Sequence, residues 1–258
     1  MTDLTLLQAV GLFVAAAVGG AINAVAGGGS FVTLPMLMLY GHVPAVPANA
    51  TSTVALWPGS IASARAYRKE LQTQRDILLR MGLVSLLGGV LGSLLLLHTK
   101  NADFVKLLPW LLFGATLVFT FGGAITKFVK SRVGPTSMPA WVSLVGTTLF
   151  QFVIAVYGGY FGGGIGILML ATLALMGMED IHTMNALKTL LASLINGAAV
   201  VLFIAYRAVY WPQACVMLVG AILGGFFGAD YAKRIPPLRV RQFVILVGFG
   251  LSAYYFMR

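Results

Sequence analysis

The stretch "AVAGGGSFVTLPMLM", residues 24–38, places three consecutive glycines inside a long uncharged segment. Each glycine in a helix interior costs about 1 kcal/mol relative to alanine. Gly27–Gly29 therefore predict a helix break or a close approach of two backbones. The apolar run that follows, residues 30–41, is too short to cross a hydrocarbon core about 30 Å thick. We expect one helix to end at these glycines and a second, shorter helix to begin after them.

The rest of the chain has the composition of a membrane protein with several spans. Of its 258 residues, 59% are hydrophobic and 9% are charged, whereas soluble domains carry about 25% charged residues. Most of its apolar runs are about 20 residues long, which suits a membrane-crossing helix. The ten runs cover residues 4–26, 30–41, 48–64, 77–97, 104–126, 140–161, 164–177, 186–205, 211–229 and 240–257. This pattern predicts an all-α polytopic membrane protein with a single transmembrane domain over residues 1–258.

The net charge of +10 bears on the partners of the chain. Its basic residues cluster in the loops between the apolar runs, which is typical of membrane topology and of contact with anionic lipid headgroups. We therefore expect the lipid bilayer as a partner and no nucleic acid.

The chain repeats itself after 136 positions. With that shift, Gly27-Gly28 aligns with Gly163-Gly164 and Asn49-Ala50 aligns with Asn185-Ala186, without a gap. A fixed register that includes a polar residue is more specific than matches of small residues alone. We expect a first repeat over about residues 1–130, a linker over about 130–139 and a second repeat over about 140–258.

The distribution of Lys and Arg favours inverted repeats. In that arrangement each half has a glycine-broken re-entrant or half-helix pair and three transmembrane helices. The loops at 65–80, 127–139 and 232–241 then face the cytoplasm with 12 Lys and Arg, against 4 on the other side. Parallel halves give 10 against 6. Since basic loops stay in the cytoplasm, the inverted model is favoured, with both termini outside.

The two glycine clusters are candidate binding sites. A break at Gly27–Gly29 or at Gly162–Gly164 leaves the first N–H groups of the next half-helix without partners, and the helix dipole makes this end attractive to an anion. Ser30 follows the first cluster and is a candidate N-cap or ligand. The alternative interpretation is that these glycines only let helices pack closely, as small residues do in membranes.

Two polar faces accompany the breaks, in "PANATST" (47–53) and "TMNALKT" (183–189). Asn49, Ser52 and Thr53 share a helix face by their spacing, and Asn185, Lys188 and Thr189 repeat it. Helix capping is the alternative explanation, since Asn and Thr are common N-cap residues. Two equivalent polar faces beside two breaks favour a binding site.

Lys188 is the basic residue placed most clearly inside an apolar run. A charge in a membrane is costly and often functional, so it predicts a cation that faces an anionic substrate. The alternative is that Lys188 reaches the interface from a helix end. Its counterpart in the first repeat is Ser52. Asn23 and Gln151 lie just ahead of the breaks. For these two residues, two roles remain open: they line the cavity, or they form hydrogen bonds with a neighbouring helix.

The residue types that are missing from the apolar runs exclude some classes of function. No Asp or Glu lies deep in an apolar run, which argues against a cation antiporter and for a neutral or anionic substrate. No enzyme motif is present, so we expect no catalysis, no metal and no cofactor.

Two stretches resemble the signatures of the TauE/SafE sulfite exporter family, the TSUP transporters. These are "GGAINAVAGGGSFVTLPMLMLYG…PANATSTVALWPG" and "YGGYFGGGIGILMLATLALMGMEDIHTMNALKTLLASLIN". The resemblance covers essentially the whole chain. It implies a bacterial inner-membrane carrier that exports sulfite or another organosulfur anion by alternating access. The matching positions are Gly27–Ser30, Asn49–Ser52, Gly162–Gly164, Asn185 and Lys188.

The resemblance leaves three points open. A homodimer is possible, because carriers of this kind are often homodimers. A channel for small anions or neutral solutes is one alternative to a carrier. A non-transporting membrane subunit, with residues 65–80 as its docking surface, is the other.

Overall fold

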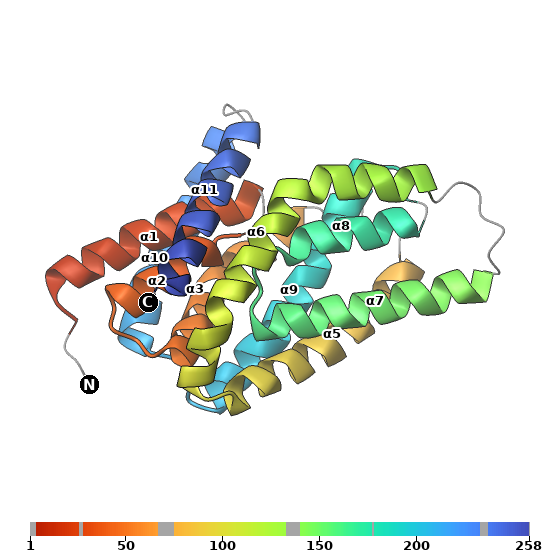
Figure 1. The fold of residues 1–258 in the computed structure, drawn as a ribbon. Coiled ribbons are helices and arrows are strands. Elements are labelled where there is room, and N and C mark those ends of the chain that lie inside the picture. The colour runs from red at the N-terminus through yellow and green to blue at the C-terminus, as the bar shows by residue number, and fades with distance from the viewer. Residues whose placement is uncertain are drawn as a thin grey trace.

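The computed structural model describes residues 4–25, 28–66, 75–132, 140–176, 178–232 and 237–257, and these residues form helices joined by turns (Figure 1). The helices are α1 (Leu6–Val25), α2 (Ser30–Leu39), α3 (Ala45–Ala66), α5 (Arg75–His98), α6 (Asn101–Arg132), α7 (Ala140–Tyr160), α8 (Ile165–Leu175), α9 (Ile181–Ala205), α10 (Trp211–Ala232) and α11 (Pro237–Phe256). The predicted all-α fold is confirmed.

Four of the described helices are long and apolar enough to cross a membrane. The segments are Leu6–Asn23, Asp76–His98, Asn101–Gly122 and His182–Ala205. In contrast, α2 and α8 have 10 and 11 residues. At 1.5 Å per residue they are about 15–17 Å long, roughly half of a hydrocarbon core. Each short helix follows a glycine cluster, as the sequence predicts.

The helices pack in a pattern that is unchanged when the two halves are exchanged. Helix α1 packs along α10, and α7 packs along α5; likewise α3 contacts α10, and α9 contacts α5. The starts of α3 and α9 are 136 positions apart, as are those of α6 and α11. At the centre, Trp57 Nε1 donates to the carbonyl oxygen of Ser193, 136 residues away, at 3.0 Å. An approximate two-fold axis therefore passes between α3 and α9.

Glycines allow the long helix pairs to touch backbone to backbone. A Cβ atom on Gly92 would lie 2.0 Å from the carbonyl oxygen of Val156, and one on Gly224 would lie 1.9 Å from that of Ala17. No side chain larger than hydrogen fits at either position. Glycines of this kind serve close helix packing, which is the usual role of small residues in membrane proteins.

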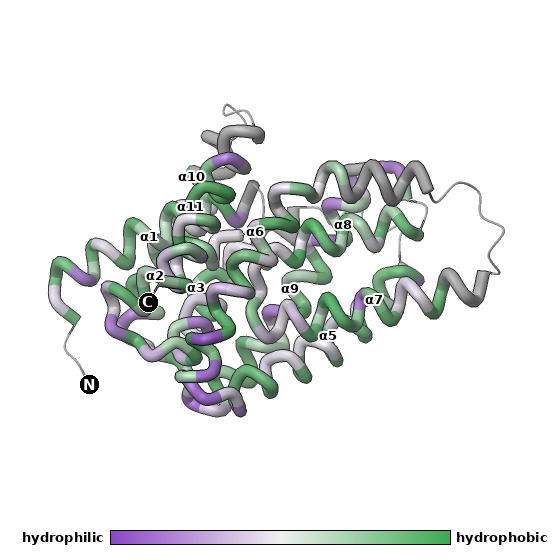
Figure 2. Tube along the Cα trace, viewed as in Figure 1, coloured by the Kyte–Doolittle hydropathy of each residue, from purple (hydrophilic) through white to green (hydrophobic). Residues whose placement is uncertain are grey.

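The surface of the bundle is apolar. Leu6, Leu149 and Phe226 are 82%, 63% and 67% exposed, and hydrophobic residues continue along the outer helices in Figure 2. The interior packs around fully buried side chains such as Phe31 and Phe203. An exposed apolar surface of this extent suits contact with lipid rather than with water.

The helices extend further into the predicted basic loops than expected. Helix α3 continues to Ala66, α5 begins at Arg75 and α6 continues to Arg132. Lys and Arg are good helix formers, so each helix continues past its apolar run into the neighbouring basic residues. The predicted linker over 130–139 therefore begins inside α6, and its residues 133–139 lie outside the described part. The loop expected at 232–241 is also shorter, because α11 begins at Pro237.

Candidate functional site

The first glycine break separates α1 from α2. Helix α1 ends at Val25 and α2 begins at Ser30, and the predicted site residue Gly27 lies outside the described residues. Gly28 and Gly29 are buried. A Cβ on Gly29 would lie 2.3 Å from the carbonyl oxygen of Gly19 in α1, so α2 packs directly on the backbone of α1. The chain thus turns back on itself at the first break.

The second glycine break separates α7 from α8 in the same way. Gly162 and Gly164 have φ values of +82° and +78°, a left-handed conformation that glycine adopts without strain. Helix α8 begins directly after them at Ile165. The N–H groups of Gly163–Gly166 have no hydrogen-bond acceptor among the described residues. Such free N–H groups at a helix start are the usual anion-binding feature of a helix N-terminus.

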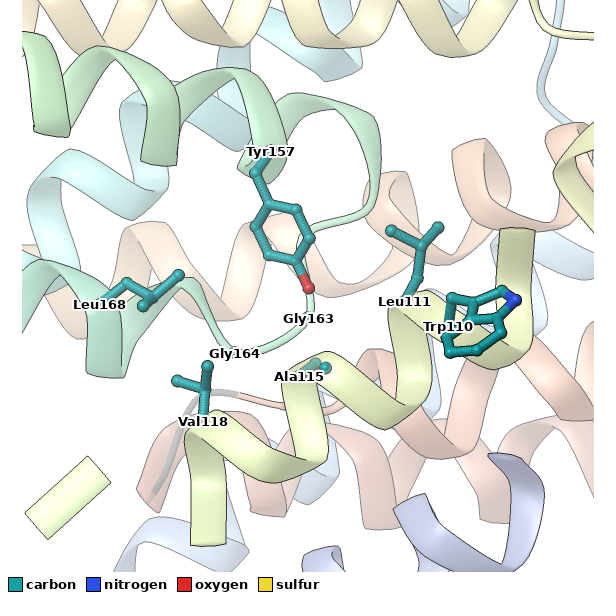
Figure 3. Close-up of a pocket in the computed structure, with 9 residues that line it drawn as sticks. Trp110, Leu111, Ala115, Val118, Tyr157, Gly163, Gly164 and Leu168 are labelled. Carbon is teal, nitrogen blue, oxygen red and sulfur yellow. The ribbon is translucent and has the colours of Figure 1, made fainter. Parts of the chain in front are cut away.

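A cavity of about 240 Å³, here called the α8 cavity, lies at this second break (Figure 3). Its lining comes from α6 (Trp110, Leu111, Gly114, Ala115 and Val118), from Tyr157 of α7, and from Gly163, Gly164 and Leu168. The hydroxyl of Tyr157 points toward the turn at Gly163 in Figure 3. The lining is otherwise apolar. The α8 cavity therefore offers neutral donors against apolar walls.

Lys188 lies against the first turn of α8. Its Nζ donates to Asn185 Oδ1 at 3.0 Å. A Cβ on Gly166 would lie 3.3 Å from Lys188 Cδ, so the lysine stem crosses α8 where a side chain is missing. Lys188 is half-buried within the candidate span His182–Ala205. It forms no salt bridge with any described residue.

The α8 cavity and Lys188 lie on different flanks of α8. Gly166 faces Lys188, whereas Leu168 lines the cavity. Two residues correspond to about 200° around a helix. Both flanks border the same free N–H groups at the start of α8. The dipole of α8 and the ammonium of Lys188 add their positive potentials there.

The two predicted polar faces are not helix caps. Asn49 is the fifth residue of α3 and Asn185 is the fifth residue of α9. The cap of α9 is Asp180, whose carboxylate accepts from the N–H groups of His182 and Thr183. The Thr183 hydroxyl also donates to this carboxylate, and this side-chain hydrogen bond, followed by the two backbone ones, lowers the pKa of the Asp180 carboxyl.

The first polar face reaches the second break. Asn49 Nδ2 donates to the carbonyl oxygen of Tyr160, the last residue of α7, at 2.9 Å. Ser52 Oγ lies 2.6 Å from Thr33 Oγ1 of α2. Thr53 only donates back to the Asn49 carbonyl in its own helix. The face therefore joins α2, α3 and the end of α7.

The remaining predicted residues are placed apart from this face. Thr189 follows Lys188 on α9 and is half-buried. No hydrogen bond between described residues links Lys188 to residues 49–53. Asn23 Nδ2 donates to Ser60 Oγ at 3.2 Å, and Gln151 Nε2 donates to Ser85 Oγ at 2.9 Å. Each of these two amides thus bonds a neighbouring helix, and neither lines the α8 cavity.

The sequence reasoning missed the walls of the α8 cavity. Tyr157 stands in "YGGYFGGG", and a tyrosine five residues before a glycine break was a usable signal. Trp110 and Ala115 gave no such signal, because an aromatic and a small residue in an apolar run look like ordinary packing. Their approach to Gly164 arises from the contact between α6 and α8.

Comparisons with known proteins match nearly the whole chain. The family model for sulfite exporter TauE/SafE matches residues 12–255. A probable membrane transporter protein of Haemophilus influenzae is 30% identical over 94% of this chain and 92% of its own length. One from Sinorhizobium sp is 28% identical over 98% and 94%. The probable membrane transporter protein YfcA of Escherichia coli is 27% identical over 94% and 87%. No solved structure matches the chain.

Proposed function

Because the chain belongs to the sulfite exporter TauE/SafE family, we propose that it is a secondary transporter of a small anion, sulfite or a short organosulfonate, and exports it across a bacterial inner membrane. The observation that carries this proposal is the position of Lys188 against the first turn of α8. A cation and a helix N-terminus there create a positive site within the bundle.

The charges around this site favour an anion over a cation. Among the carboxylates whose side chains are described, Asp76, Asp103, Glu179 and Asp180 are all exposed. None of them neutralises Lys188. A positive charge inside a membrane-spanning bundle without a counter-ion is costly, and an anionic ligand relieves this cost. A cationic substrate would be repelled by both the ammonium and the helix dipole.

The α8 cavity suits an oxyanion that carries a small organic group. The Tyr157 hydroxyl and the free N–H groups of Gly163 and Gly164 are donors that an oxyanion accepts. Trp110 and Leu111 form apolar walls for a carbon chain. Lys188 acts from the other flank of α8 and raises the local positive potential.

Two contacts support inverted repeats. The rings of His98 and Tyr206 lie 6.5 Å apart, and Tyr210 N donates to Thr51 Oγ1 at 3.0 Å. By the first contact, the turn between α5 and α6 lies beside the turn between α9 and α10. By the second, the turn between α9 and α10 also lies beside the first half of α3. Parallel halves would put these two turns on opposite sides of the membrane, whereas inverted halves put both outside. Rocking of one half against the other then gives alternating access.

The energetics fit export. Moving one negative charge out of an inside-negative cell releases about 2.3 kcal/mol per 100 mV, so the carrier does not require a coupled ion to export its anion. The inverted arrangement places both termini outside. A homodimer remains a prediction, and none of these steps depends on it.

A thermal-shift screen of the purified protein tests this function. We expect sulfite, thiosulfate or sulfoacetate to raise the unfolding temperature in a saturable way, with taurine and sulfate as comparison ligands. A ligand at 100 times its Kd adds about 2.7 kcal/mol to the stability of the native state. No saturable shift with any of these anions would contradict the proposal.

The variant Tyr157→Phe tests the α8 cavity separately. It removes one hydroxyl donor and keeps the ring, so we expect the apparent affinity for the anion to fall about tenfold, which corresponds to roughly 1.4 kcal/mol. The unfolding temperature without ligand should stay unchanged. Tyr206→Phe removes the hydroxyl of an exposed tyrosine and serves as the control. Equal affinities in both variants and in the wild type would place the anion elsewhere.

A further inference from the structure

We infer that the first half of the molecule binds a monovalent alkali-metal cation, sodium or potassium, at Asn49. This cation takes the place that the Lys188 ammonium occupies in the second half. The inference does not rest on the identity of the transported anion.

The side-chain amide of Asn49 is buried, and its oxygen lacks a hydrogen-bond partner among the described residues. Asn49 is 2% exposed, and its Nδ2 donates to the carbonyl oxygen of Tyr160. Its Oδ1 is buried and has no hydrogen-bond partner in the described part of the chain. Rotating the amide by 180° would set Oδ1 against the Tyr160 carbonyl, so the observed orientation is the favourable one. A buried acceptor is normally paired with a hydrogen-bond donor or a cation.

The second half shows what satisfies the equivalent oxygen. Asn185, 136 positions after Asn49, presents its Oδ1 to the ammonium of Lys188 at 3.0 Å. The residue equivalent to Lys188 in the first half is Ser52. The first half therefore keeps the amide oxygen and lacks the positive charge that pairs with it.

The side chains near Asn49 are suited to a monovalent cation. Ser52 lies one turn further along the same face of α3, and its Oγ contacts Thr33 Oγ1 at 2.6 Å. Thr33 Oγ1 donates to the carbonyl oxygen of Gly29, so Ser52 supplies the proton to Thr33 and keeps its own lone pairs. Both hydroxyls are fully buried. These oxygens are neutral, whereas protein sites for divalent ions are built with carboxylates.

The test measures the unfolding temperature of the purified full-length protein without sulfite. Chloride is the common anion, and N-methyl-D-glucamine is replaced by sodium or potassium at constant ionic strength. We expect a saturable rise of about 5 °C for at least one of the two cations. Asn49→Ala should abolish the rise. Gln213→Ala should retain the rise. Like Asn49, Gln213 is buried, at 3% exposed, and its side-chain oxygen has no partner among the described residues, but it lies on α10.

A second variant keeps the test decisive if Asn49→Ala does not fold. Ser52→Lys supplies the ammonium that the second half already has. Its unfolding temperature should no longer respond to sodium or potassium. Binding of ²²Na⁺ or ⁸⁶Rb⁺ to the wild type, measured by equilibrium dialysis, gives a direct readout. Equal unfolding temperatures of the wild type in all three chloride salts, with no bound isotope, would overturn the inference and assign the Asn49 oxygen to a water molecule.

Discussion

Replacing Lys188 by methionine is expected to abolish transport of the anion at substrate concentrations that saturate the wild type. Methionine keeps most of the apolar stem that crosses Gly166 and removes the charge. The ammonium acts across α8 through the positive potential that it adds at the start of that helix, and two unit charges about 6 Å apart interact by roughly 2.8 kcal/mol at an effective dielectric constant of about 20. We therefore expect the apparent affinity to fall at least 100-fold, which corresponds to about 2.7 kcal/mol.

The measurement is efflux of sulfite from loaded proteoliposomes that contain equal amounts of each protein. Lys106→Met is the matched control, because Lys106 is an exposed lysine on α6 and its loss changes the net charge equally. The control should transport like the wild type. An unchanged rate and affinity in Lys188→Met would show that Lys188 serves the membrane interface and not the substrate.

Replacing Gly29 by alanine is expected to destabilise the protein at the first glycine break. The added Cβ would lie 2.3 Å from the carbonyl oxygen and 2.9 Å from the carbonyl carbon of Gly19. Backbone atoms cannot move aside as a flexible side chain does, so α2 must separate from α1. Overpacking of this kind costs about 1–3 kcal/mol. We expect the unfolding temperature to fall by roughly 5–10 °C.

Gly146→Ala is the matched control for this substitution. A Cβ on Gly146 meets no atom within 4 Å, and the residue is exposed on α7. Alanine is the better helix former, so this variant should unfold at the same or a slightly higher temperature. If Gly29→Ala were as stable as Gly146→Ala, the close approach of α1 and α2 would be wrong.

The parts of the site that depend on local sequence could be predicted. Each of the two triple-glycine clusters precedes an apolar run too short to cross a membrane, so the breaks before α2 and α8 followed from the sequence. Paired glycines alone do not break a helix, since Gly88-Gly89 lies inside α5 and Gly224-Gly225 inside α10. The faces that carry Asn49 and Asn185 followed from helical spacing. Asn49 and Asn185 are the fifth residues of α3 and α9. A helix cap lies outside the first turn, so neither residue is a cap.

The parts that depend on packing could not be predicted. The approach of Trp110 and Ala115 to Gly164 requires the contact between α6 and α8, which no local pattern encodes. The placement of Lys188 on the flank of α8 opposite the cavity depends equally on how α9 crosses α8. The helices also extend further into the predicted loops than expected, because Lys and Arg are good helix formers and continue a helix beyond its apolar part.

We expect the protein to act as a carrier with a saturable anion site at the start of α8. Counterflow of ³⁵S-labelled sulfite into proteoliposomes tests it most directly. A carrier takes up the label faster when the vesicles contain unlabelled sulfite, and the uptake saturates. We predict this stimulation in the wild type and its loss in Lys188→Met. Uptake that neither saturates nor responds to internal sulfite would indicate a channel, and no uptake of any anion, with a soluble partner that co-purifies, would indicate a non-transporting subunit.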